Sequence, residues 1–87
     1  MPRVTLPEHQ RIIAIDLVLA RVRHEIIRAI KKHGPMTSPH EGYAVLLEEV
    51  DELWDHVKRD TAYSPEAMKE AIQVAAMGVR YVADLEE

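Results

Sequence analysis

The chain has 87 residues and a formal net charge of −4, and it contains no cysteine, which excludes disulfides, thiolate zinc sites and cysteine nucleophiles. Apolar residues make up 47% of it but include no Phe and only one Trp, so we expect a thin aliphatic core that association between chains completes. The acidic balance argues against general nucleic-acid binding. The sequence has no apolar run of about 18 residues and no signal-peptide apolar region, so we expect a soluble cytoplasmic protein without a membrane partner.

The first predicted helix runs from about residue 7 to residue 32, where apolar residues recur at every third or fourth position. Gly34 and Pro35 follow a lysine pair, a combination typical of a helix C-terminus. The positive charge of this helix is the one feature that favours a nucleic-acid partner. It comes from Arg21, Arg23, Arg28, Lys31 and Lys32.

The second predicted helix begins at Ser38 and Pro39 and ends near Arg59. The serine supplies an N-cap, the proline suits the first helical position, and Glu41 is placed for a capping box. Its apolar residues follow an uninterrupted helical spacing, which predicts that they face the core. These residues are Tyr43, Leu46, Leu47, Val50, Leu53, Trp54 and Val57.

The third predicted helix starts at Ser64 and Pro65, which repeat this start signal, and extends to about residue 85. Apolar or small residues surround most of it, so we expect it to pack on two sides, one of them against another chain. The sequence therefore predicts an all-α fold, in which a single domain of residues 1–87 forms three helices and assembles into a homodimeric or homotetrameric bundle.

Acidic side chains share one face of the second helix, at Glu48, Glu49 and Glu52. Like charges this close destabilise a helix unless a cation lies among them, and hard oxygen ligands suit Mg²⁺ or Mn²⁺. The third helix could add Glu70 and Gln73 if it pairs antiparallel with the second. The alternative is an ordinary solvated acidic face.

The pattern Glu48-Glu49-x-x-Glu52, 17 intervening residues and Glu70-x-x-Gln73 resembles the E-E-x-x-E…E-x-x-D motif of MazG-like all-α nucleoside triphosphate pyrophosphohydrolases. The segment 33–54 also resembles small bacterial and phage members of that superfamily, and the resemblance as a whole covers roughly residues 25–85. It implies a Mg²⁺-dependent oligomeric bundle that cleaves a nucleoside triphosphate to the monophosphate and pyrophosphate.

The resemblance also implies roles for individual residues. Glu48, Glu49, Glu52 and Glu70 would bind metal, with Glu49 and Glu52 also acting in catalysis by positioning water. Gln73 stands where the motif has Asp, so this corner of the metal site keeps an oxygen ligand but loses a negative charge. The alternative is a relative that is weak or inactive as an enzyme and serves as a helical oligomerisation or interaction module.

Other polar and aromatic residues have two interpretations each. Trp54 and Tyr43 suit core anchors or stacking on a nucleobase, and His56 suits a helix surface or a metal ligand one turn beyond the carboxylates. Cations could contact phosphates or serve the helix dipole. The candidates are Lys58, Arg59, Arg80 and the basic end of the first helix, residues 28–32.

Overall fold

The computed structural model describes residues 5–86 and contains three α-helices and no strand within that range. Helix α1 spans Glu8–Lys32, α2 spans Pro39–Lys58 and α3 spans Pro65–Leu85. The predicted all-α, three-helix chain is thereby confirmed, and both ends of α1 and α2 and the start of α3 lie within one residue of their expected positions. The predicted domain of residues 1–87 extends beyond the described residues at both ends.

The predicted serine caps explain where α2 and α3 begin. Ser38 Oγ accepts a hydrogen bond from the backbone N–H of Glu41 at 3.1 Å, and Ser64 Oγ accepts one from Ala67 at the same distance. The Glu41 side chain differs from the expected capping box, because its carboxylate accepts a hydrogen bond from the Thr37 hydroxyl, at 2.5 Å.

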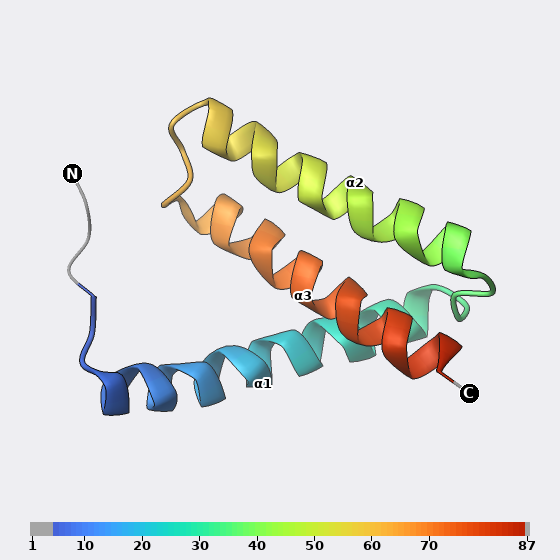
Figure 1. Cartoon of the computed structure of the whole chain (residues 1–87), viewed down its shortest axis with the longest axis horizontal. Helices are drawn as coiled ribbons and strands as arrows, with labels where there is room; N and C mark the ends of the chain where they lie inside the picture. Colours follow the sequence, from blue (N-terminus) through green and yellow to red (C-terminus); the bar gives the residue numbers. More distant parts are fainter. Residues whose placement is uncertain (1–4, 87) are drawn as a thin grey trace.

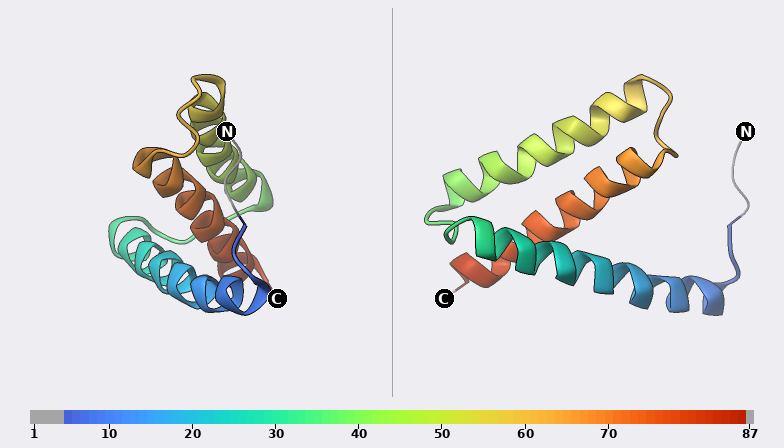
Figure 2. Two further views of the ribbon diagram at one scale, coloured as in Figure 1. Left: turned by 90° about the vertical axis from the view of Figure 1, so that its left-hand side faces the viewer. Right: turned by 180° about the vertical axis from the view of Figure 1, so that it is seen from behind.

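Helix α3 lies at the centre of the molecule and packs against both other helices, while α1 and α2 do not contact each other closely. Helices α2 and α3 run antiparallel as a hairpin, and the second half of α1 crosses α3 (Figure 1). The two further views show the first half of α1 projecting beyond the hairpin (Figure 2). The predicted packing of α3 on two sides is therefore found, but both neighbours belong to the same chain.

The small core forms where α1 crosses α3, near the loop that joins α1 to α2. Its buried members are Val22, Ala29, Met36, Ala76 and Met77. Helix α2 approaches closely at Gly42, which is buried: a Cβ added there would lie 2.7 Å from Cδ2 of Tyr81 and 3.2 Å from Sδ of Met36. Only a residue without a side chain fits this contact as it stands.

The predicted core face of α2 is wrong for the single chain. Trp54 is 55% exposed and Tyr43 is 62% exposed, and of the seven residues only Leu46 and Leu53 are half-buried. The reason is geometric: α2 has one neighbouring helix, which covers the side of Gly42, Leu46 and Leu53, and the remaining apolar residues lie farther round its circumference. The chain alone leaves this apolar stripe in contact with solvent.

A buried arginine fixes the loop between α1 and α2 to α3. Arg80, only 4% exposed, donates from Nη2 to the backbone carbonyl of Gly34 at 2.9 Å. One turn later, Asp84 Oδ2 accepts a hydrogen bond from the backbone N–H of Met36, also at 2.9 Å. Both contacts hold the end of α1 and the start of α2 in place around the site.

Candidate functional site

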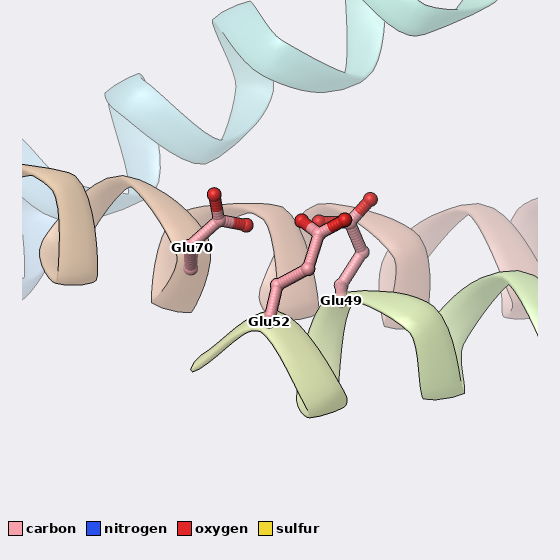
Figure 3. A group of neighbouring side chains, drawn as sticks. All are labelled: Glu49, Glu52 and Glu70. Carbon is pink, nitrogen blue, oxygen red and sulfur yellow. The ribbon is translucent and has the colours of Figure 1, made fainter. Parts of the chain in front are cut away.

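Three carboxylates from two helices converge at the middle of the hairpin. Glu49 and Glu52 on α2 and Glu70 on α3 each offer an oxygen, and these oxygens all lie within 4.8 Å of one another. Figure 3 shows the three carboxylates turned toward the same space, with α1 lying beyond them. Antiparallel pairing brings Glu70 to this point although it is far from Glu49 and Glu52 in sequence.

Glu49 and Glu52 hold their protons more tightly than isolated glutamates do. Burial, followed by the negative charge of Glu52 and by the Glu70 carboxyl, raises the pKa of Glu49 to about 7. Hydrogen bonding with Glu70 is the largest cause that raises the pKa of Glu52, with burial next. The cluster therefore carries like charges that repel each other when all three groups ionise.

The donor set fits a hard divalent cation. Glu70 Oε2 is buried, and no N–H or O–H group of residues 5–86 donates to it when the neighbouring carboxyls are ionised. None of the ion pairs formed by residues 5–86 involves the three carboxylates. Buried polar atoms normally have partners, so a lone oxygen among acids is a position that a cation would satisfy. All-oxygen ligands from carboxylates suit Mg²⁺ or Mn²⁺.

The cluster lies in the wall of a cavity of about 620 Å³ between the three helices. A cavity of this size can hold a small-molecule ligand. Its walls differ in charge: α2 lines it with carboxylates and Val45, whereas α1 lines it with Arg28, Ala29 and Lys32, followed by His33 just beyond the helix end. Helix α3 lies between them with residues of both kinds. Its lining residues are Lys69, Glu70, Gln73, Met77 and Arg80.

The other predicted metal ligands also line this cavity, but they lie outside the tight group. Glu48 is exposed and its carboxylate is not among the three that converge. Gln73 is half-buried. The pKa of Glu25 on α1 is lowered chiefly by its hydrogen bond with Arg28, burial opposes this effect, and a hydrogen bond with the Gln73 side chain adds a smaller lowering. Gln73 therefore lies where α1 meets the cavity.

Several candidates lie away from the cavity. Tyr43, Trp54, Lys58 and Arg59 do not line it. Lys58 instead pairs with Asp55 at 3.2 Å, with its Nζ 6.0 Å from the centre of the Trp54 ring. Nucleobase stacking on Trp54 or Tyr43 is thus not available in this cavity within one chain.

His56 also belongs to a local contact. Its Nδ1 lies 3.0 Å from the Thr61 hydroxyl, just beyond the end of α2, and it is not part of the cavity lining. The interpretation of His56 as a helix-surface residue agrees with this position.

Three ionisable residues of the cavity, His33, Glu41 and Lys69, lie outside the site predicted from the sequence. Glu41 suits a capping box because it stands three positions after Ser38, and Lys69 stands beside Glu70 with no distinguishing pattern. A helical projection would place Glu41 one turn before Val45 and two before Glu48, on the acidic face. No local signal marks Lys69.

Comparisons with protein-family models, curated proteins and solved structures gave no match for this chain. No helix within residues 5–86 combines the length and apolar character needed to cross a membrane.

Proposed function

We propose that this protein is a divalent-cation-dependent hydrolase that cleaves a nucleoside triphosphate to the monophosphate and pyrophosphate. The observation that carries the proposal is the convergence of Glu49, Glu52 and Glu70 beside a cavity with a cationic opposite wall. Hydrolysis of a triphosphate needs both the carboxylate cluster and the cationic wall. Metal ions and cationic side chains must neutralise its negative charge while a water molecule is positioned for attack. The resemblance to MazG-like enzymes agrees with this interpretation.

Glu49, Glu52 and Glu70 would hold the cation, with Glu48 and Gln73 at the edge of the site. A bound Mg²⁺ or Mn²⁺ supplies charge neutralisation of the phosphates and of the leaving pyrophosphate. Glu52, the exposed member of the cluster, positions the attacking water. Glu49, the half-buried neighbour of Glu52, would accept the proton of this water as a general base. The water oxygen bonds to the α-phosphorus as the bond to pyrophosphate breaks.

We further propose that two or more chains assemble through the face of the hairpin that turns away from the cavity. At about 100° per residue, Met68, Val79 and Val82 follow one stripe of α3 opposite its cavity residues. The exposed stripe of α2 flanks it on the same side. A second copy of the same face would cover both stripes and form a helical bundle.

Sedimentation equilibrium tests this assembly. Wild type is expected to be at least a dimer, and Trp54→Lys should dissociate it because a charge would be buried at the contact. Asp51→Lys, also exposed on α2 but outside the stripe, should leave the mass unchanged. A wild-type monomer at micromolar concentration contradicts the proposed assembly.

The hydrolase proposal is tested by incubating the protein with all common ribo- and deoxyribonucleoside triphosphates and Mg²⁺ or Mn²⁺. Pyrophosphate and nucleoside monophosphate should appear in equal amounts with at least one substrate, and Glu52→Gln should abolish both. Release of inorganic phosphate instead would contradict cleavage at the α-phosphorus. If wild type forms no more product than Glu52→Gln does, the hydrolase proposal is contradicted. The alternative is then a non-enzymatic interaction module, which the exposed apolar stripes favour.

A further inference from the structure

The two walls of the cavity have opposite charge, and the separation follows from the fold. Helices α1 and α2 both pack on α3 but not on each other, so the cavity opens between them. The ionisable side chains that α2 presents to it are all carboxylates, whereas α1 presents the cations Arg28 and Lys32. A ligand that spans the cavity would meet the carboxylate cluster on one side and cations on the other.

The Arg28 side chain is held in place by Glu25, and this contact does not use its terminal N–H donors. Both of its hydrogen bonds run from Nε to the Glu25 carboxylate, at 2.8 and 2.9 Å, which leaves its two terminal nitrogens without a partner in these contacts. Glu25 is thus a positioning residue for the guanidinium at the cavity edge. Arginine donors in this planar arrangement match the oxygens of a phosphate group.

A third observation comes from α3. Arg80 lines the same cavity and is 4% exposed, and its Nε is buried without a hydrogen-bond partner. Its terminal nitrogens donate to Gly34 and Met77, and these contacts hold the guanidinium in the cavity lining. The fixed positive charge of Arg80 favours an anion in this part of the cavity.

The C-terminus of α1 also has a dipole that opposes anion binding. A helix C-terminus carries a partial negative charge of about half an elementary charge, which disfavours an anion. Arg28 and Lys32 supply two full positive charges within the last two turns, and Lys69 from α3 adds a third. The cations therefore outweigh the dipole.

We propose that Arg28 and Lys32 bind the polyphosphate tail of the substrate, with Lys69 and Arg80 beside them. This inference rests on the proposed function and extends it by assigning the side of the cavity at which the tail lies. The phosphates point toward α1, and the α-phosphorus lies nearest the carboxylates of α2. A nucleoside monophosphate, which has no tail, gains little from these cations.

Two double variants of α1 with the same charge change test the assignment. Arg28→Gln with Lys32→Gln removes the cavity cations, whereas Arg23→Gln with Lys31→Gln removes two exposed cations that do not line the cavity. Titration calorimetry with saturating Mg²⁺ would measure binding of a non-hydrolysable α,β-methylene nucleoside triphosphate, inorganic tripolyphosphate and a nucleoside monophosphate.

The triphosphate analogue should bind the cavity double variant at least about tenfold more weakly than wild type, while the control double variant binds as wild type does. Charge-conserving Arg28→Lys with Lys32→Arg should restore most of the affinity, which excludes misfolding as the cause. Monophosphate binding should be nearly the same in all variants.

Equal affinity of the two double variants for the analogue, or no binding by wild type, would overturn the inference. Tighter binding of tripolyphosphate than of the nucleotide analogue would also overturn it, because the site would then serve free polyphosphate. Turnover is measured separately on the same proteins. Turnover by wild type with equal affinities in both double variants contradicts only the inference, and absent turnover contradicts the proposed function.

Discussion

The guanidinium of Arg80 donates to the backbone carbonyl of Gly34 at 2.9 Å, across 46 positions of sequence. This bond joins the C-terminal part of α3 to the loop between α1 and α2. The same arginine lies 3.8 Å from Asp84, whose carboxylate holds the next part of the loop through Met36. The relative placement of the two charged walls therefore depends on a buried polar contact.

Replacing this arginine should destabilise the fold. Arg80→Gln leaves the Gly34 carbonyl and Asp84 without their partner, and we expect the free energy of unfolding to fall by about 2–3 kcal/mol. Urea denaturation followed by circular dichroism measures this. Arg23→Gln, at an exposed position, serves as the control and should change stability by less than about 0.5 kcal/mol. Equal effects of both substitutions would mean that the contact with Gly34 does not stabilise the loop.

The two helical glycines should respond to alanine in opposite directions. Gly42→Ala places a methyl group against the Tyr81 ring, so it should destabilise by about 1–3 kcal/mol despite the better helix propensity of alanine. Gly78→Ala meets nothing within 4 Å and should stabilise by about 0.5–1 kcal/mol. Thermal melts of both variants provide the comparison. Stabilisation by Gly42→Ala would show that α2 can move away from α3 without cost.

The helices could be predicted from the sequence because their signals are local. The capping serines and the glycine-proline stop lie within a few residues of the boundaries they set. The convergence of the three carboxylates could also be predicted from the sequence, because Glu49 and Glu52 are one turn apart and the spacing to Glu70 matches an antiparallel hairpin.

The burial of α2 could not be predicted in this way. An apolar stripe shows which side of a helix avoids water, but not whether a helix of the same chain covers it. Trp54 and Tyr43 are exposed because α3 packs on the adjacent side, at Gly42. The contact by which Arg80 fixes the loop could not be predicted either, because its acceptor is a backbone carbonyl that carries no sequence signal.

The raised pKa of Glu49 predicts a pH dependence of stability in the metal-free protein. Its folded pKa of about 7 exceeds the ordinary value of 4.5, so the folded state binds the proton more tightly. The resulting stabilisation is complete below pH 4.5 and is lost as pH rises through 7, by roughly 1–3 kcal/mol. Glu49→Gln should remove most of this loss between pH 5 and 8, whereas Glu66→Gln, outside the cavity, should keep it. Urea denaturation with a chelator present measures this pH dependence. Identical pH profiles for Glu49→Gln and wild type would contradict the prediction.

Gln73→Asp should strengthen the proposed site. A negative charge beside Glu70 favours cation binding, and we expect pyrophosphate release to rise by about tenfold, which corresponds to about 1.4 kcal/mol of barrier. The Mg²⁺ concentration for half-maximal activity should fall. Gln73→Asn has the same length as Asp without its charge and should not give this gain. If Asp and Asn have the same effect, charge at position 73 does not limit the reaction.

Binding of Mn²⁺, followed by the paramagnetic resonance signal of the free ion, tests the central claim most directly. Wild type at pH 7.5 should bind at least one ion per chain, Mg²⁺ should compete for it, and Glu49→Gln or Glu70→Gln should weaken binding by about tenfold or more. Glu66→Gln, an exposed acid on α3 outside the cavity, should bind Mn²⁺ as wild type does. If wild type and all three variants bind equally, or if NaCl of equal ionic strength displaces the ion as well as Mg²⁺ does, the carboxylates do not form a metal site.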